Sequence, residues 1–457
     1  SPDGRYLYVV DRGTRKVVRF TPELCLGPEH RASCASGSWG GRGRGNTLFE
    51  SPVGLATDRE GQVYVVDQGT DEVKVFDADA HVVYPRDLWF KYLDKKHVSR
   101  IDVRDPAGLQ HYNPVLVDGR YTQHPTSLYG QFQKAIDWTH EDIVEKYGEL
   151  ITKGFTGERV AKALAREGID LAVIYGPEWD LWFDGIDPEL QAAMVRAYNR
   201  WGQEMRESSG GRVLTASPIA LGDVKRAIEE IEYAYHVLGH RSFWARPNFL
   251  NRRNLGDRYY DPIYALIESL DCAFATHEFM GFATESEGSN RFFTFTEWHT
   301  VVHPHEAMNA MVSMLVHGVF ERFPKLRCGY LEAGCGWVPS WLHRIDEQLE
   351  MAGAKEFPEL TMTATEYFKR NCWTTTECED PFVSDVIRWL GNDHIVFESD
   401  FPHPDSKYPD ATKHFLELPK ELVSEDSKRK ILWDNALDFY RLPESYLPTE
   451  YFEPPSE

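Results

Sequence analysis

Residues 73–81 read VKVFDADAH, a strand-like run that ends with two metal-binding side chains, Asp79 and His81. Side chains two residues apart on a strand point to the same face, so these two can bind one ion. Two later strand-like runs also end in such residues, with His277 in ATHE and Asp400 in FESDFPH. Together the three patches would leave a coordination position for water, as a hydrolytic metal centre requires. The sequence therefore predicts a metalloenzyme.

From about residue 72 onward, strand-like runs alternate with long amphipathic helices, a pattern that indicates an α/β fold. Eight such units predict a (β/α)8 TIM-like barrel, whose active site lies at the carboxyl ends of the strands. Residues 82–168 are less regular, and we expect them to wrap the barrel mouth or to form a subunit contact. The expected strands are residues 73–81, 171–175, 212–220, 242–248, 272–277, 327–332, 371–376 and 394–400. Among the expected helices are residues 188–206, 224–237, 262–270 and 421–440.

Residues 1–71 contain an internal repeat, in which DGRYLYVVDRGT (3–14) returns as EGQVYVVDQGT (60–70). A strand, an Asp-x-Gly-Thr turn and a second strand are typical of a propeller blade, and this all-β segment resembles NHL repeats. Two repeats cannot close a propeller, so a pair of hairpins packed on the main domain is the alternative. Because residues 73–77 cannot serve both a blade and the barrel, we assign them to the barrel. The chain begins inside the repeat, and we expect it to be a fragment or a processed product.

The composition argues against several classes of protein. The chain of 457 residues is 42% hydrophobic, which suffices for a large barrel and an appendage. Its formal net charge of -22 argues against nucleic-acid binding, because a phosphate backbone would be repelled. No apolar run approaches the roughly 20 residues of a membrane span, and no signal-peptide pattern opens the sequence. Seven scattered cysteines indicate reduced thiols, and we expect a cytoplasmic enzyme.

Six short motifs spread over about four-fifths of the chain: DADAH (77–81), DLW (87–89), FERFPKL (320–326), LEAGCGW (331–337), SDFPH (399–403) and NA (435–436). They make residues 72–445 similar to the amidohydrolase-related family, the metal-dependent branch that includes aminocarboxymuconate-semialdehyde decarboxylase and resorcylate decarboxylase. The resemblance implies that Asp79, His81, His277 and Asp400 bind a catalytic divalent metal. It alone also suggests a homo-oligomer. The acidic tail, residues 446–457, is expected to lie outside the barrel domain.

One position departs from this family pattern. The decarboxylases of the family place a proton-handling histidine where this sequence has Glu332. A carboxylate cannot do that work near neutral pH unless its pKa is strongly raised, so Glu332 suits a bridging metal ligand or a general base. With His299, His303 and His305 in the loop after the fifth strand, it could build a second metal site that activates water or oxygen. A subset similar to aminoisobutyrate hydroxylase uses such a metal pair. Alternatively, these histidines help to cap the following helix.

Three further residues complete the expected site. Arg246, near the end of the fourth strand, could clamp a substrate carboxylate, although a structural ion pair is the commoner role of such an arginine. The runs RPN from residue 246 and YDP from residue 260 are similar to the hydroxylase subset. His403 follows Asp400 by three residues and would orient or protonate a reacting group in the site. Trp337 would form an aromatic wall of the substrate pocket.

We expect a metal-dependent hydrolase that acts on a small organic substrate and binds one or two ions, either Zn or Mn and Fe. The metal would lower the pKa of bound water, Asp400 would take the proton, and the hydroxide would attack an amide, an ester or a related carbon. Glu332, His303 and His403 are the further catalytic candidates. A dinuclear Mn or Fe oxygenase is the first alternative, and non-oxidative decarboxylation is the second. An inactive barrel beside an NHL-like binding module is the non-enzyme alternative, which the intact ligand set disfavours.

Overall fold

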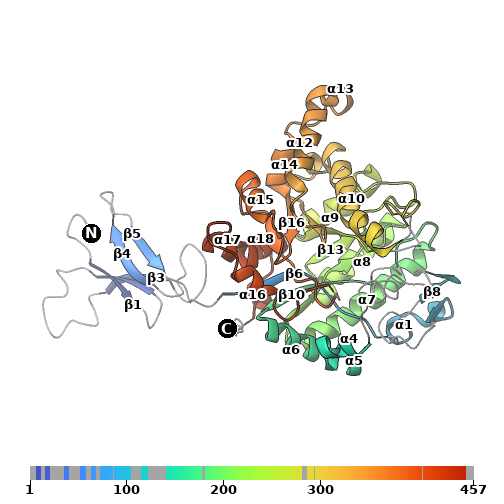
Figure 1. Cartoon of the computed structure of the whole chain (residues 1–457), viewed down its shortest axis with the longest axis horizontal. Coiled ribbons are helices and arrows are strands. Elements are labelled where there is room, and N and C mark those ends of the chain that lie inside the picture. The colour runs from blue at the N-terminus through green and yellow to red at the C-terminus, as the bar shows by residue number, and fades with distance from the viewer. Residues whose placement is uncertain are drawn as a thin grey trace. The chain divides into compact units, whose positions relative to one another are not determined.

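The protein is described from a computed structural model (Figure 1). The chain divides into two compact units, Ser1–Val73 and Lys74–Glu457, and each is considered by itself. The residues that the structure describes are 7–11, 16–20, 35–40, 52–57, 63–67, 73–85, 87–103, 115–121, 140–177, 181–279, 286–292, 294–403 and 405–448.

The smaller unit contains short antiparallel strands. β1 (Leu7–Asp11) pairs with β2 (Lys16–Phe20), and β2 pairs with β3 (Ala35–Gly40). β4 (Pro52–Thr57) pairs with β5 (Val63–Asp67). The first sequence repeat therefore forms the hairpin β1–β2, whereas the strand of the second repeat, β5, pairs with the strand before it. These pairings do not show a propeller, and the resemblance to NHL repeats stays a prediction.

The larger unit is a parallel β-barrel with helices around it, and the expected α/β barrel is confirmed (Figure 1). The strands pair in two parallel runs, β11-β10-β6 and β12 through β17 in chain order. Each of the eight expected strands has a counterpart. The expected strand 212–220 corresponds to two strands, β11 and β12, so nine strands of the described residues match the eight expected: β6 (Phe76–His81), β10 (Leu171–Tyr175), β11 (Val213–Thr215), β12 (Ser217–Pro218), β13 (Ser242–Ala245), β14 (Ala273–His277), β15 (Arg327–Leu331), β16 (Cys372–Thr376) and β17 (Ile395–Phe397).

Two local features join these runs into one barrel. The expected strand 212–220 is split at Ala216, whose backbone N donates to the Ile174 carbonyl of β10 at 3.0 Å. Three residues later, Ile219 N donates to the Trp244 carbonyl of β13 at 2.9 Å, so this segment pairs with one neighbour and then with the other. At the remaining seam, His81 N of β6 donates to the carbonyl of Phe401, just after β17, at 2.6 Å.

Helices follow the strands, and some of them begin at a side-chain cap. Asp187 caps α7 by accepting from Glu189 N, and Asp223 caps α8 by accepting from Arg226 N. The expected helix at 421–440 begins later, at Glu425, and contains a π-helical turn. The helices after β10 are α7 (Pro188–Ser208), α8 (Val224–Tyr233), α9 (Asp261–Ser269), α10 (Phe295–Val316), α11 (Val319–Arg322), α12 (Val338–Gln348), α13 (Ala354–Glu356), α14 (Ala364–Asn371), α15 (Val383–Leu390), α16 (Ala411–Leu416), α17 (Glu425–Arg429) and α18 (Asn435–Tyr440).

In the described residues between β6 and β10 the elements are short. A small antiparallel sheet, β7-β8-β9, forms part of it, and α6 leads back to the barrel. Its elements are α1 (Leu88–Tyr92), α2 (Lys95–Val98), β7 (Ile101–Val103), β8 (Val115–Val117), β9 (Arg120–Tyr121), α4 (His140–Tyr147), α5 (Glu149–Lys153) and α6 (Gly157–Glu167). None of the helices in the described ranges combines the length and the hydropathy that a membrane crossing requires.

The barrel strands are buried on both faces, as parallel strands covered by helices are. Most side chains on them are apolar, but β6 reads FDADAH and is buried at all six positions. Burying carboxylates and an imidazole is costly unless they are paired or bind an ion. The polar strand end of β6 therefore needs a special explanation.

Candidate metal centre

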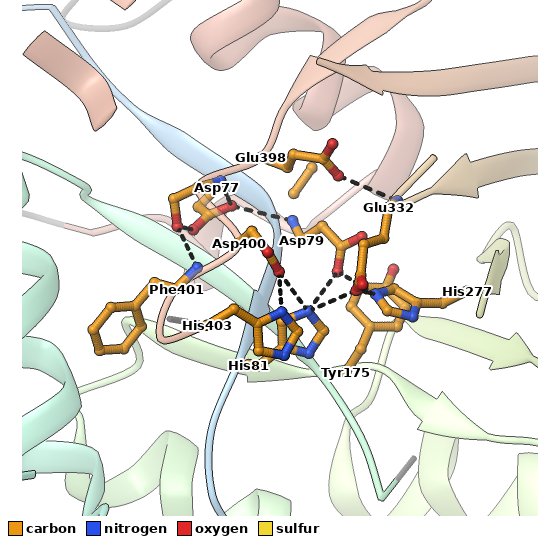
Figure 2. A network of polar contacts seen from close by, with 12 residues as sticks. Asp77, Asp79, His81, Tyr175, His277, Glu332, Glu398, Asp400, Phe401 and His403 are labelled. Carbon is orange, nitrogen blue, oxygen red and sulfur yellow. Dashed lines mark hydrogen bonds and ion pairs between the residues drawn. The ribbon is translucent and has the colours of Figure 1, made fainter. Parts of the chain in front are cut away.

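Five side chains from four strand ends meet at the carboxyl end of the barrel (Figure 2). Asp79 and His81 belong to the end of β6, His277 is the last residue of β14, Glu332 follows β15 directly, and Asp400 lies three residues after β17. Parallel strands end at the same rim of a barrel, which brings residues far apart in sequence together there. The predicted ligand set therefore lies at one place.

The distances within this cluster are those of groups that share one centre. His277 Nε2 lies 3.2 Å from Asp79 Oδ1 and 2.6 Å from Glu332 Oε2. His81 Nε2 lies 3.1 Å from the same Glu332 oxygen and 3.3 Å from Asp400 Oδ1. Asp79, His81 and His277 each offer one ligand atom, and these three atoms lie within 4.8 Å of one another. His81 also belongs to a second such group, with Glu332, Asp400 and His403.

The atoms of the cluster also lack ordinary partners. Asp79, His81 and His277 are at most 2% exposed. Within the described part of the chain, both carboxylate oxygens of Asp79 and both ring nitrogens of the two histidines make no hydrogen bond of good geometry. A buried polar group left unpaired costs about 1–3 kcal/mol, so a bound cation would relieve a large penalty. Carboxylate and imidazole donors in this number fit Zn²⁺, Mn²⁺ or Fe²⁺.

Electrostatics point the same way. Burial lowers the pKa of His277, but Asp79 and Glu332 outweigh it and raise that pKa to about 9. Burial likewise opposes the charged form of His81, yet its contacts with Asp400 and Glu332 hold its pKa well above the usual value. The pKa of Glu332 lies well below its usual range because His277 and His303 overcome the effect of burial. The cluster thus stabilises positive charge, which a divalent ion supplies without protonating the ligands.

Two of the carboxylates sit on strained backbone. Glu332 has φ 48° and Asp400 has φ 54°, in the left-handed region that residues other than glycine seldom adopt. Such strain persists only where surrounding structure enforces it, and it is concentrated at functional sites. In both cases the turn directs the residue after a strand into the barrel mouth (Figure 2).

Glu332 lies between two groups of imidazoles. Its Oε2 faces His81 and His277, while its Oε1 lies 3.3 Å from Nδ1 of His303. The ring of His299 contacts that of His303 edge to face, with centroids 5.0 Å apart. A carboxylate in this position can bridge two centres, as the sequence suggested.

The expected location of these histidines was wrong. They do not lie in a loop but inside α10, which begins at Phe295 behind a capping box made by Thr294 and Glu297. Within that helix His299 and His303 are four residues apart and share a face, whereas His305 is exposed. The sequence T-x-x-E at residues 294–297 is the helix-start signal that would have placed them correctly.

The other predicted site residues have these positions. His403 Nδ1 lies 2.6 Å from Asp400 Oδ1, and the His403 ring stacks on His81 with centroids 4.3 Å apart. Arg246 is 2% exposed, and its guanidinium is held by Glu278 Oε1 at 2.6 Å, which is the structural alternative. Trp337 is half-buried, and its indole N–H donates to the backbone carbonyl of Ala333, the residue after Glu332, at 2.8 Å. Substrate roles for Arg246 and Trp337 stay predictions.

Several neighbours of the cluster were not anticipated. Tyr175 and Phe279 stack on the His277 ring, with centroids 5.2 Å and 4.2 Å away. Asp77 accepts hydrogen bonds from the backbone N of Asp79 and of Ser399. Glu398 accepts one from Glu332 N at 3.2 Å. Asp77 and Glu398 each precede a predicted ligand by two residues, a period-two signal that the sequence does contain.

Comparisons with known proteins agree with this fold. A family model described as Amidohydrolase matches residues 183–442. A curated 2-amino-3-carboxymuconate-6-semialdehyde decarboxylase of Dictyostelium discoideum is 26% identical over 204 residues, which cover 43% of this chain and 53% of that protein. The chain therefore matches about half the length of this curated relative.

Solved structures extend the comparison to most of the barrel. An amidohydrolase of Mycobacterium avium subsp. paratuberculosis is 21% identical, with a TM-score of 0.63, and the match covers 81% of this chain and 99% of that one. A dihydroxybenzoic acid decarboxylase of Polaromonas sp. JS666, with bound manganese and the inhibitor 2-nitroresorcinol, is 20% identical, with a TM-score of 0.54 over 69% of this chain and 95% of that one. At these identities the likeness supports the barrel fold alone.

Proposed function

Because the chain belongs to the Amidohydrolase family, whose model matches more than half of its residues, we propose that it is a metal-dependent hydrolase of a small organic substrate. The observation that carries the proposal is the convergence of two imidazoles and three carboxylates on one point, with buried atoms that have no other described partner. Such a donor set at the rim of a barrel is suited to hold an ion and a water molecule.

Each residue of the cluster has a defined part in this proposal. Asp79, His81, His277 and Asp400 would hold the ion, which would lower the pKa of a bound water and polarise a substrate carbonyl. Asp400 would accept the proton of that water, since its Oδ1 is already 2.6 Å from Nδ1 of His403, where the proton can be shared. The aromatic rings of Tyr175 and Phe279 keep His277 in one orientation and exclude water from its face.

His303 and Glu332 would complete the machinery. Burial lowers the pKa of His303 to about 3 despite the nearby Glu332 carboxylate, so its imidazole is neutral near pH 7. Its Nδ1 is buried and makes no hydrogen bond to a described residue. A neutral imidazole 3.3 Å from a carboxylate would be free to accept a hydrogen bond or to bind a second ion, whereas its low pKa makes it a weak proton acceptor near pH 7.

The test is hydrolysis of a panel of amides and esters by the metal-loaded chain and by Asp400→Asn. We expect turnover that requires added Zn²⁺ or Mn²⁺ and falls by about 100-fold or more in the variant, because a proton acceptor contributes that much. Asp385→Asn is the matched control, since Asp385 is a surface residue on α15 whose ion-pair partner in the described part of the chain is Arg388. Equal activity of Asp400→Asn and Asp385→Asn would contradict the assigned role of Asp400.

Decarboxylation is a second candidate, and it is favoured by what the relatives are. Both the Dictyostelium relative and the Polaromonas structure are decarboxylases by name, and the latter holds manganese. If the metal-loaded chain released CO₂ from small carboxylic acids and left amides and esters intact, this candidate would replace the hydrolase. The same panel therefore separates the two.

A dinuclear oxygenase is supported by a different observation, the position of Glu332 between His303 and the pair His81 and His277. Two Mn or Fe ions per chain, falling to one in Glu332→Ala, together with substrate-dependent oxygen uptake, would support this candidate. A single Zn ion that is unaffected by Glu332→Ala would exclude the bridging role and leave Glu332 as a base.

A further inference from the structure

Two buried carboxylates lie directly behind the metal cluster without belonging to it. Asp77 precedes Asp79 by two residues on β6, and Glu398 precedes Asp400 by two residues at the end of β17. Asp77 is 0% exposed and Glu398 is 1% exposed. Neither has an ion pair with a cation among those found in the described ranges. Burying a carboxyl group in this way costs several kcal/mol, so each must be retained for what it does to its neighbours.

Asp77 links β6 to the segment just after β17. It accepts hydrogen bonds from Ser399 N at 3.1 Å and from the Ser399 hydroxyl. The same Ser399 oxygen accepts from Phe401 N at 3.1 Å, and the Phe401 carbonyl accepts from His81 N at 2.6 Å. These bonds hold Ser399 and Phe401, the residues on either side of Asp400, and Phe401 is bonded in turn to His81. They therefore fix the backbone positions of two predicted ligands, Asp400 and His81, relative to each other (Figure 2).

Glu398, directly after β17, is hydrogen-bonded to the residue directly after β15. Its Oε2 accepts a hydrogen bond from Glu332 N at 3.2 Å. This backbone N–H belongs to the residue with φ 48°, so the bond holds the peptide that enters the left-handed turn. Without an acceptor there, the Glu332 backbone loses the contact that opposes its relaxation into an ordinary conformation.

We propose that Asp77 and Glu398 are positioning residues that set the spacing of the metal-binding groups at the ends of β6, β15 and β17, without binding the ion themselves. This inference deepens the proposed function and rests on it. Groups that orient metal ligands through hydrogen bonds change metal affinity by about 10–100-fold when they are removed. Glu398 acts through Glu332, and Asp77 acts through Ser399 on Asp400 and His81.

The experiment is a Mn²⁺ titration of the full chain, followed by the electron paramagnetic resonance signal of the free ion. Glu398→Leu removes the acceptor and should weaken Mn²⁺ binding by about 10-fold or more. Glu398→Gln keeps an oxygen in the same place and should restore binding to near the wild-type level. Rescue by Gln identifies the hydrogen bond as the cause, because a lost charge would not be restored.

Glu167→Leu is the matched control for buried carboxylates. Glu167 is 0% exposed and accepts a single backbone hydrogen bond, from Ala411 N at 3.1 Å. The charge of Asp77 acts on it, but no hydrogen bond or ion pair joins Glu167 to a metal-binding residue in the described ranges. It should lower thermal stability as Glu398→Leu does while leaving Mn²⁺ binding unchanged. Ser399→Ala is the second arm if Glu398→Leu does not fold, since it removes only the hydroxyl bonds to Asp77 and Phe401. It too should weaken Mn²⁺ binding by about 10-fold.

The outcomes separate this inference from the proposed function. Wild-type protein that binds Mn²⁺ together with variants at Glu398 and Ser399 that bind it equally well would overturn the positioning role and leave the function standing. Equal weakening by Glu167→Leu would also overturn it, because general destabilisation would then be the cause. Weakened variants in a chain without hydrolytic activity would retain the positioning role and refute the hydrolase. Wild-type protein that binds no metal would refute both.

Discussion

Glu332 occupies a central position in the site, between two groups of imidazoles. One of its oxygens is shared by His81 and His277, and the other faces His303. A cation bound beside one oxygen of this carboxylate would therefore alter the affinity for a cation beside the other oxygen. Its left-handed backbone and the acceptor provided by Glu398 fix that placement.

A second buried carboxylate predicts a pH effect on stability. Burial raises the pKa of Glu167 to about 8, well above the value of about 4.3 expected in an unfolded chain. Between these pH values the folded protein binds more protons than the unfolded protein, so its free energy of unfolding falls as pH rises. Glu167→Gln keeps the acceptor for Ala411 N and cannot ionise. We expect it to melt about 2 °C or more above wild type at pH 8.5 and to show no such gain at pH 5.

Thermal melts of both proteins across that pH range measure the effect. Glu356→Gln, at an exposed position, is the control and should follow wild type throughout. A constant difference between Glu167→Gln and wild type at all pH values would show that Glu167 does not titrate in this range.

At this scale the sequence predicted which groups would meet, because the rule that parallel strands end at one rim needs only local information. Asp79, His81, His277, Glu332 and Asp400 lie together as expected, although their roles as ligands stay predictions. Asp77 and Glu398 were missed since their partners, Ser399 and Glu332, are distant in sequence or reached only through backbone atoms. A buried carboxylate cannot be told from an exposed one until those partners are known.

The element that matters most beyond the strands is α10, because its first turns carry His299 and His303 to the barrel mouth. Its start is fixed by Thr294, whose hydroxyl accepts from Glu297 N, while the Glu297 side chain accepts from Thr294 N. The position of His303 relative to Glu332 depends on where this helix begins.

Thr294→Ala should therefore cost about 1 kcal/mol of stability, the usual value of an N-cap, and should also weaken Mn²⁺ binding. Denaturant unfolding and the Mn²⁺ titration measure the two effects. Thr363→Ala is the matched control, because Thr363 and Glu366 form the same capping box on α14, which carries no group of the cluster. It should lose similar stability and bind Mn²⁺ normally. Weaker binding in Thr363→Ala would attribute the effect to global loosening.

Elements were predicted well where a single period persisted and poorly where tertiary pairing interrupted it. All eight strands were found, but the break at Ala216 depends on two different neighbours, Ile174 and Trp244, which no local pattern announces. Likewise, the stretch from Glu425 to Tyr440 has continuous helical periodicity, yet residues 430–434 form a π-helical turn. The start of α10 was missed although its capping box is a local signal.

For the whole larger unit, a bound ion should act as a stabilising ligand. Binding to the folded state alone raises the free energy of unfolding by about 2.7 kcal/mol when the free ion is at 100 times its dissociation constant. Treatment with a chelator should lower the melting temperature, and added Mn²⁺ should restore it. His277→Ala should not respond to Mn²⁺, because it removes a central nitrogen of the cluster. Identical melting of wild type with and without metal would contradict a site in the folded protein.

The barrel cannot close during synthesis until both β6 and β17 have been translated. Asp77 and its partner Ser399 are 322 positions apart in the chain. At the usual elongation rates of about 5–20 residues per second, the first strand waits roughly tens of seconds on the ribosome for its neighbour. Until then Asp79 and His81 lie on an open parallel edge, which other chains can pair with. A nascent chain that stops before Asp400 has only part of the metal-binding set and an unclosed barrel. We expect chaperones and proteases to bind the strand edge that it exposes.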